Sequence, residues 1–204
     1  PLVCTMNVTL VTEAARHLFD WSHAAYDEAV QSVGPGSDGL LLLPYLSGER
    51  TPNLPNGCGM FHGITTKNFT EAHIARAAME GVTLGLGYGL QRLRELGMAP
   101  QEIRLTGGGS LSPGWRQICA DVFGVPVVGL AGGEGGGLGA AMQAAWQYVQ
   151  NRGENCPLDE LASRLVKCDE STRALPVAAS TEIYRDLLER TGRLRAVLSG
   201  SNLL

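Results

Sequence analysis

The chain has 204 residues, of which 44% are hydrophobic and 18% are charged, and its formal net charge is −4 at pH 7. This composition is typical of one folded domain with a sizeable core, and the 27 glycines suit an α/β protein with many glycine turns. The negative charge argues against nucleic acid as a partner, and no apolar run in the sequence approaches the roughly 20 residues of a membrane span.

The chain begins at Pro1 without an initiator methionine or a signal-peptide pattern, so we expect it to be a fragment of a longer protein. Its five cysteines are scattered and have no C-x-x-C spacing. This pattern predicts reduced thiols in a cytoplasmic protein.

The first segment alternates apolar residues from Val3 to Leu10, which predicts a strand, and a helix is expected to begin at Thr12 or Glu13 and to carry Trp21. Two histidines lie on or beside this helix, at positions 17 and 23. Neither has a partner at metal-ligand spacing, so we interpret them as solvated or core side chains rather than as ligands.

The apolar run Leu40–Leu43 predicts a strand that is buried on both faces. It leads into the polar loop 44–52, and loops at strand ends often carry functional residues. Glu49 and Arg50 of this loop are either functional residues or solvated or paired surface charges, and the spacing favours neither. Residues 53–69 are expected to be loop and turn.

Thr70 is predicted to cap the longest helix, which is expected to end near Leu96. Gly81, Gly85 and Gly89 recur at four-residue spacing and share one face of it, at a cost of about 1 kcal/mol each relative to alanine. The spacing predicts that a sheet or another helix packs very close to all three. Charged residues nearby argue against the alternative, a membrane dimer stripe.

The central stretch predicts a β-α-β unit with a glycine turn. A strand at 103–105 runs into the turn 107–109, a helix follows from Pro113 to Phe123, and a second strand begins at Pro126. Ligands of such units usually lie beyond the carboxyl ends of the strands, so the turn is the expected contact point. A purely structural turn remains the alternative. The P-loop and G-x-G-x-x-G motifs are both absent from the sequence.

A second glycine-rich segment, 131–141, is predicted to lead into a helix that ends near Val149. Glu134 would repel a phosphate there, so close packing of a helix on a sheet is favoured over an anion site. Two amphipathic helices are expected at 157–165 and 180–198, around an irregular link. No residue of this last part stands out as catalytic.

Five motifs follow one another along the chain: PYLSGERTP at 44–52, GMFHGI at 59–64, HIARAAME at 73–80, TGGGSLSPGWRQICADVFGVPV at 106–127 and EGGGLGAA at 134–141. In this order they resemble the carboxyl-terminal half of the sugar kinases of the FGGY family. The resemblance covers nearly everything from residue 3 to about residue 149, and the SGERTP loop is most similar to the members that phosphorylate xylulose.

The resemblance implies an α/β domain of the ribonuclease-H-like, actin-like ATPase fold, with a mixed sheet and flanking helices, lacking its first strands. Residues 1–150 would form the amino-terminally truncated ATPase domain of the carboxyl-terminal half, and 151–204 a helical extension packed on it. The catalytic aspartate and a loop for the β-phosphate would lie upstream of Pro1. No catalytic residue and no metal ligand is therefore assigned in this chain.

The family's adenosine motif, whose backbone lies beside adenine and ribose, maps onto Gly107, Gly108, Gly109 and Ser110. By a looser alignment, Thr12 and Arg16 would reach the ribose or a phosphate. Pro113 stands where glycerol kinases have an asparagine for adenine, so adenine recognition would depend on backbone and shape. Cys58 replaces an arginine that many relatives have, and any role of that arginine is lost.

The complete enzyme would transfer the γ-phosphoryl group of ATP to the 5-hydroxyl of xylulose, with Mg²⁺ neutralising charge. The sugar would be bound mainly by the absent amino-terminal domain, and a homodimer is left open. We expect the isolated chain to be inactive, to bind nucleotide weakly and to be prone to aggregation at an unpaired sheet edge.

Three other functions are considered. The enzyme could phosphorylate ribulose, fructose, glycerol or another sugar, or the chain could belong to a non-catalytic nucleotide or sugar sensor with the same fold. A dinucleotide-binding oxidoreductase is disfavoured by the missing third glycine and by the absence of an acidic residue near Val128.

Overall fold

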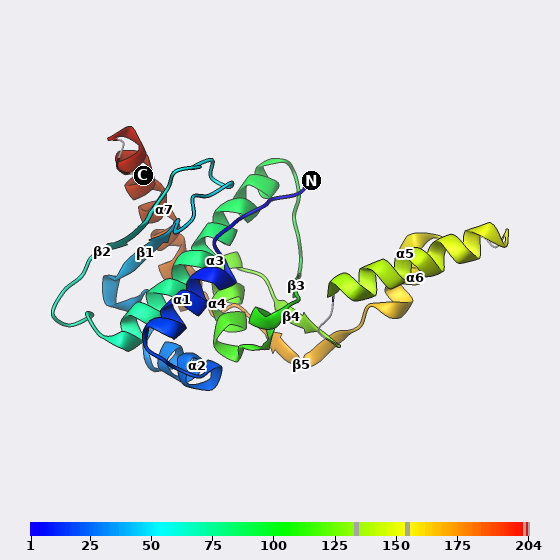
Figure 1. The fold of residues 1–204 in the computed structure, drawn as a ribbon, viewed down its shortest axis with the longest axis horizontal. Helices are drawn as coiled ribbons and strands as arrows, with labels where there is room; N and C mark the ends of the chain where they lie inside the picture. Colours follow the sequence, from blue (N-terminus) through cyan, green and yellow to red (C-terminus); the bar gives the residue numbers. More distant parts are fainter. Residues whose placement is uncertain (133–134, 154–155, 202, 204) are drawn as a thin grey trace.

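The structure is a computed structural model that describes residues 1–132, 135–153, 156–201 and 203. Helix α3 runs through the middle of the main body, and the helices α5 and α6 extend from that body as an arm (Figure 1). The helices are α1 Thr9–Leu18, α2 His23–Ser32, α3 Glu71–Glu95, α4 Pro113–Phe123, α5 Gly135–Asn151, α6 Leu158–Leu165 and α7 Ala178–Gly200, with short 3₁₀ turns η1 Ser37–Gly39 and η2 Gly108–Leu111. The strands are β1 Leu41–Pro44, β2 Gly59–His62, β3 Ile103–Leu105, β4 Val127–Leu130 and β5 Cys168–Ala174.

The strand predicted over residues 3–10 is wrong, because α1 already begins at Thr9 and the residues before it belong to neither described sheet. The backbone N–H groups of Met6 and Asn7 donate to the Glu49 carboxylate, at 2.7 and 3.3 Å. These donors are thus satisfied by a side chain instead of a neighbouring strand. The helix also ends earlier than expected, at Leu18.

Strand β1 is buried along its whole length, as the apolar run predicted. It pairs antiparallel with β2, with Leu41 opposite His62 and Pro44 opposite Gly59. The expectation of loop and turn for all of residues 53–69 is therefore wrong over β2. That strand contains glycine and histidine and is largely exposed, so its sequence lacks the alternation that identifies a half-buried strand.

Helix α3 is capped by the Thr70 side chain, which accepts from the His73 N–H, and it packs against β1 and against helices α1, α2, α4 and α7. A Cβ at Gly81 would lie within 3.0 Å of the Leu42 carbonyl oxygen, and one at Gly89 would lie 2.5 Å from Val3 Cγ1. Close packing against a sheet is confirmed at Gly81. Gly89 is also closely packed, but its neighbour Val3 lies in the segment before α1 and belongs to no sheet or helix. Close packing is wrong for Gly85, where a Cβ would meet nothing within 4 Å.

The β-α-β unit is confirmed. Strands β3 and β4 are parallel and α4 connects them, beginning at Pro113 behind the Ser112 cap and ending at Phe123 before Gly124, whose φ is 66°. An unpredicted third strand, β5, pairs antiparallel with the other side of β4 and makes the sheet mixed. Helix α7 then packs on α4 and α3.

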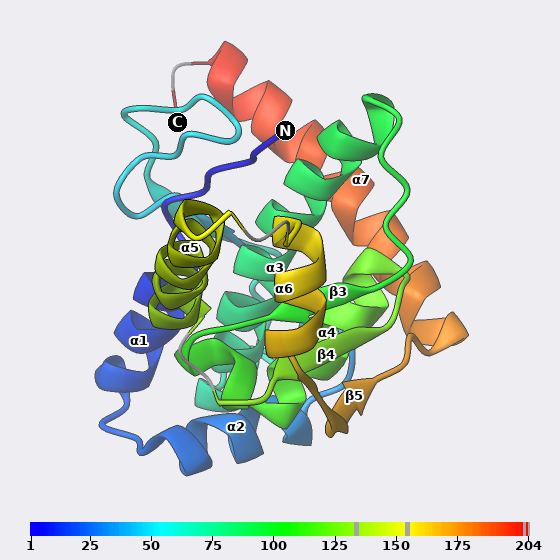
Figure 2. The ribbon, with the colours of Figure 1, turned by 90° about the vertical axis from the view of Figure 1, so that its right-hand side faces the viewer.

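The arm does not pack as the glycine-rich segment predicted. No described residue of α5 is buried, and Cβ atoms at Gly136, Gly137 and Gly139 would meet nothing within 4 Å. Close packing of this helix on a sheet is therefore wrong at these positions, and its main neighbour is α6 (Figure 2). Glu134 lies outside the described residues, and the division of the chain at residue 150 stays a prediction.

None of the described helices combines the length and the apolar character needed to cross a bilayer.

Candidate functional site

The glycine turn after β3 is closed by its own hydrogen bonds. The Ser110 N–H and the Ser110 hydroxyl both donate to the Gly107 carbonyl oxygen, at 3.0 and 2.7 Å. Gly107 has a φ of 85°, a left-handed value that glycine adopts without strain. Ser110 is buried, so its hydroxyl shapes the turn from inside.

Two side chains of α4 hold this turn in place, and the sequence analysis did not identify either. Arg116 donates to the Ser110 carbonyl oxygen at 2.7 Å and to the Thr172 carbonyl oxygen of β5 at 2.9 Å. Trp115 lies where a Cβ at Gly109 would be 2.7 Å from its ring, and its indole N–H donates to Thr83 of α3 at 2.8 Å. The turn is thereby fixed to both the sheet and the central helix, through contacts that no local sequence signal specifies.

Helix α2 anchors the end of the turn. The Ser112 hydroxyl donates to the Asp27 carboxylate, while the Ser112 N–H donates to the Gly109 carbonyl oxygen at 3.3 Å. A Cβ at Gly114 would lie 2.9 Å from the same carboxylate, so α2 and α4 approach closely here. The backbone of the turn is therefore supported from three sides.

The outer side of the turn is open. Cβ atoms at Gly107 and Gly108 would meet nothing within 4 Å. The first residue of α5 lies beside the same strand end, since a Cβ at Gly135 would lie 2.6 Å from the Thr106 hydroxyl oxygen. The first N–H groups of a helix have no partners within it, so a glycine turn and a helix start with bare glycines meet at one place. This arrangement lets a polar ligand approach the backbone closely.

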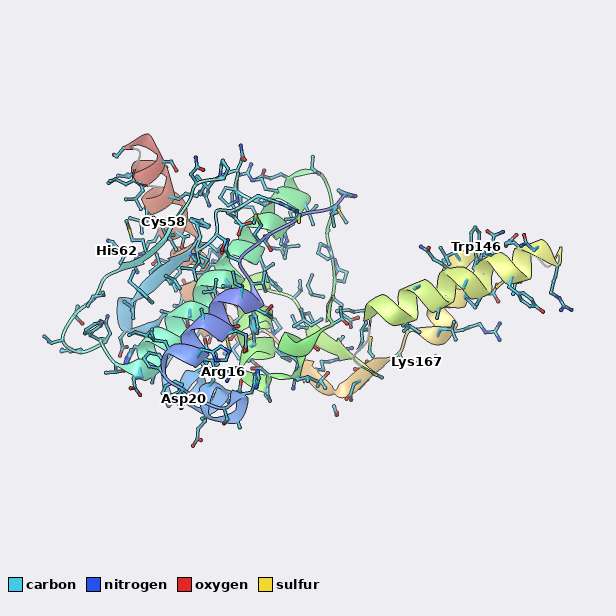
Figure 3. The ribbon with its side chains drawn as sticks, viewed as in Figure 1. Arg16, Asp20, Cys58, His62, Trp146 and Lys167 are labelled. Carbon is cyan, nitrogen blue, oxygen red and sulfur yellow. The ribbon has the colours of Figure 1, made fainter. Side chains whose placement is uncertain are left out.

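Thr12 and Arg16 are engaged locally on and just after α1. The Thr12 hydroxyl is buried and donates to the Thr9 carbonyl oxygen at 3.1 Å. Arg16 donates to Glu13 at 2.8 Å and to the Trp21 carbonyl oxygen at 2.6 Å, and its hydrogen bond to Glu13 raises the pKa of the guanidinium. Figure 3 shows Arg16 on the main body, away from Trp146 of the arm. A contact of either residue with nucleotide stays a prediction.

Glu49 is not a solvated surface charge, since it is only 4% exposed and its carboxylate is surrounded by donors, and a functional role for it stays a prediction. The Asn7 side-chain amide donates to it at 3.0 Å, and the N–H groups of Met6 and Arg50 donate at 2.7 Å each. Burial opposes ionisation, but these hydrogen bonds outweigh it and lower the pKa of Glu49. The carboxylate holds the segment before α1 against the loop. Arg50 is exposed and contacts the Cys4 sulfur at 3.4 Å.

A buried polar network ties α7 to α3, in the part of the chain where no functional residue was expected. Arg76 donates to Glu80 at 2.6 Å and to the Tyr184 hydroxyl at 2.7 Å, and that hydroxyl donates to Glu80 at 2.7 Å. The Gly36 N–H supplies a further donor to Glu80 at 2.9 Å. Because the charges are paired and bonded within the core, this network serves the structure.

The described residues contain no group of three or more His, Cys, Asp or Glu side chains placed to hold a metal ion. His17 and His23 are both exposed and face Glu13, at 3.8 and 3.1 Å from its oxygens. Of the two interpretations, solvated or core side chains, the solvated one therefore describes His17 and His23.

Comparisons with known proteins agree with this architecture. A family model described as the FGGY family of carbohydrate kinases, C-terminal domain, matches residues 9–148. The xylulose kinase of Haemophilus influenzae is 36% identical over 190 residues, which is 93% of this chain and 38% of that protein. The crystal structure of ligand-bound xylulose kinase from Lactobacillus acidophilus superposes with a TM-score of 0.86 at 30% identity, covering 97% of this chain and 39% of that one.

The gluconate kinase of Lactobacillus acidophilus superposes with a TM-score of 0.84 at 29% identity, again over 97% of this chain and 39% of that one. This chain thus spans about two fifths of the length of the relatives it matches. The predicted α/β fold of the actin-like ATPases is confirmed by these neighbours, and so is the resemblance stated from the sequence motifs. The chain belongs to the FGGY family of carbohydrate kinases, in which it corresponds to the carboxyl-terminal domain.

Proposed function

We propose that this chain is the nucleotide-binding portion of an ATP-dependent sugar kinase that phosphorylates D-xylulose to D-xylulose 5-phosphate. The observation that carries the proposal is the 36% identity with the Haemophilus influenzae xylulose kinase across 93% of this chain. Phosphoryl transfer depends chiefly on positioning and electrostatic stabilisation, so a rigid nucleotide platform is the contribution expected of such a domain.

In this proposal the adenosine lies against the open side of the turn Gly107–Ser110. Gly108 admits the ligand because no side chain stands there, and Arg116 and Trp115 keep the turn from moving when it binds. The start of α5 at Gly135 lies next to the same strand end and adds N–H groups for a polar part of the ligand. Thr12 and Arg16 are the proposed contacts from α1.

Mg²⁺ accompanies ATP in phosphoryl transfer, but none of the described residues forms a cluster that fits the ion. No step of the proposal is therefore assigned to a metal held by this chain. The same holds for the general base, which we place in the part of the enzyme upstream of Pro1.

Gluconate is the second candidate substrate, because a gluconate kinase superposes on this chain almost as well as the xylulose kinase does. Both candidates use the same nucleotide platform in this proposal. In this proposal the sugar is selected by residues outside this chain. An activity assay therefore has to distinguish xylulose from gluconate.

The test is a coupled assay of ATP consumption by the protein that contains this chain at its natural length. D-xylulose, gluconate, ribulose, fructose and glycerol are compared, each with and without Mg²⁺. We expect Mg²⁺-dependent turnover that is fastest with D-xylulose. Fastest turnover with gluconate would select the second candidate, and nucleotide binding without turnover of any sugar would instead indicate a sensor.

A substitution at the turn tests the platform itself. Gly108→Val places a branched side chain where there is open space. The fold should therefore persist, while the new side chain blocks the nucleotide from the backbone of the turn. We expect the KM for ATP to rise by about tenfold or more with little change in the KM for sugar. Gly34→Val is the matched control, since Gly34 is also a glycine with nothing within 4 Å and lies on a loop after α2. Equal effects of both substitutions would contradict the assignment.

A further inference from the structure

Helices α3 and α7 enclose, together with the end of β1, a pocket of about 420 Å³. This volume is within the range of sites for small molecules. The lining includes Pro44 and Tyr45 of β1 and its following loop, but no residue of the turn Gly107–Ser110. The proposed function therefore does not assign a ligand or a role to this pocket.

Two glycines that line the pocket, one on each helix, have no packing reason to be glycine. Gly85 of α3 and Gly192 of α7 both line it, and a Cβ at either position would meet nothing within 4 Å. Both lie inside helices, where glycine is less favourable than alanine. At Gly81, by contrast, the Leu42 carbonyl oxygen excludes a side chain. What Gly85 and Gly192 share is the open space that they leave in the pocket.

The pocket is also strongly basic. Arg92 and Arg94 of α3 and Arg185 and Arg195 of α7 line it, and Glu189 is the one carboxylate among the lining residues. The structure already pairs that carboxylate with an arginine outside the lining, Arg193, at 3.5 Å. The lining therefore keeps a positive charge that attracts anions.

Two of these guanidinium groups gather on one aromatic ring. Arg195 lies 4.3 Å and Arg92 lies 5.1 Å from the centroid of the Tyr88 ring. Arg92 also pairs with Glu95 at 2.8 Å, whereas Arg195 has no carboxylate partner among the residues that the structure describes. Arg195 interacts instead with the hydroxyl of Tyr45, a residue whose pKa is raised chiefly by burial. Both guanidinium groups thus lie beside one ring at the pocket wall, and a guanidinium binds an anion through charge-assisted hydrogen bonds.

We propose that this pocket binds a small hydroxylated phosphate monoester, of the class of phosphorylated sugars. The guanidinium groups of Arg195 and Arg92 receive the phosphate, because their planar donors match phosphate oxygens. The hydroxylated body of the ligand lies along Gly85 and Gly192, where the helices expose backbone and no side chain. The Tyr45 hydroxyl, which interacts with Arg195, helps to hold that guanidinium at the pocket wall.

Calorimetric titration of the protein with glucose 6-phosphate tests the proposal, with glucose and inorganic phosphate titrated separately. Four proteins are compared: the unsubstituted protein, Arg195→Gln, Gly85→Leu and the control Arg164→Gln, which removes an exposed charge from α6. We expect saturable binding of glucose 6-phosphate, weakened at least tenfold by Arg195→Gln because a charge-assisted hydrogen bond is lost. Gly85→Leu should weaken it similarly by filling the pocket, and the control should stay within roughly twofold.

Inorganic phosphate should bind at least tenfold more weakly than glucose 6-phosphate, and glucose should not bind measurably. Absence of saturable binding overturns the proposal, and so does binding that Arg195→Gln and Gly85→Leu leave unchanged, because the ligand then lies elsewhere. Equal affinity for phosphate and glucose 6-phosphate also overturns it, since the pocket would then recognise only an anion. If Gly85→Leu does not fold, Gly192→Leu fills the same space from α7.

Discussion

Gly81 and Gly85 lie one turn apart on α3, and alanine at the two positions should change the free energy of unfolding in opposite directions. A methyl group at Gly85 meets nothing within 4 Å, so Gly85→Ala adds only the better helix propensity of alanine. That gain is about 0.5 to 1 kcal/mol. A methyl group at Gly81 would lie within 3.0 Å of a backbone oxygen, that of Leu42 in β1.

The Gly81 substitution has the same gain in propensity, but β1 has to move to admit the methyl group. Because the obstacle is backbone in a buried strand, it cannot rotate away as a side chain would. Overpacking of this kind costs about 1 to 3 kcal/mol, and more where the backbone is involved. We therefore expect Gly81→Ala to lower the free energy of unfolding by about 1 to 2 kcal/mol, so that the two variants differ by about 1.5 to 3 kcal/mol.

The assay is thermal and urea unfolding of both variants beside the unsubstituted protein. Gly85→Ala should raise the Tm by about 1 to 4 °C, and Gly81→Ala should lower it by a similar or larger amount. Gly89→Ala is a useful third point, because its neighbour is the Val3 side chain near the chain start, which can shift at small cost. Destabilisation by Gly85→Ala as large as that by Gly81→Ala would refute the argument that the pocket beside Gly85 is open.

Four further outcomes are expected. Glu49→Gln should lower the free energy of unfolding at neutral pH by about 2 kcal/mol, because an NH2 group replaces one of the two accepting oxygens and the donors on that oxygen lose their acceptor. The pKa of Glu49 is lowered from its ordinary 4.5, so its contribution to the free energy of unfolding is present above pH 4.5 and is lost as the pH falls through the lower pKa of the folded state. If urea titrations find that the difference in free energy between this variant and the unsubstituted protein does not depend on pH, this argument is contradicted. Tyr184→Phe should cost about 1 to 2 kcal/mol in the same assay, as the hydroxyl bridges Arg76 and Glu80, and an unchanged midpoint would exclude that role. Arg116→Met should weaken ATP binding by roughly fivefold through a looser turn, measured by fluorescence titration, whereas equal affinity would show that the turn holds its shape without this arginine. The isolated chain should show no sugar phosphorylation in the coupled assay, and measurable turnover would disprove the placement of the catalytic base upstream.

Features that depend on neighbouring residues in the chain could be predicted. The Ser112 cap, Pro113 and Gly124 defined α4 to the residue, and Thr70 placed the start of α3, because capping is a contact between residues a few positions apart. The continuous apolar run identified β1 for a similar reason. The glycine turn was located by its position between a strand and a helix.

Strands β2 and β5 were missed, and a strand was wrongly predicted over residues 3–10. Each depends on whether a partner strand lies alongside, and partners come from distant parts of the chain: β5 pairs with β4 from about forty positions away. The same limit applies around the candidate site. That Arg116 reaches the turn and β5 at once, and that Asp27 of α2 accepts from Ser112, follows from how α2, α4 and the sheet are packed.

The amino-acid sequence by itself determined the capped helices, the buried strand β1, the glycine turn and, through its ordered motifs, the family. The tertiary structure decided which glycines are packed and which face open space, because that depends on atoms from another element: Leu42 covers Gly81, while nothing covers Gly85 or Gly192. It also brought the arginines of α3 and α7 around Tyr88. These side chains are about a hundred residues apart, so only the packing of the two helices joins them.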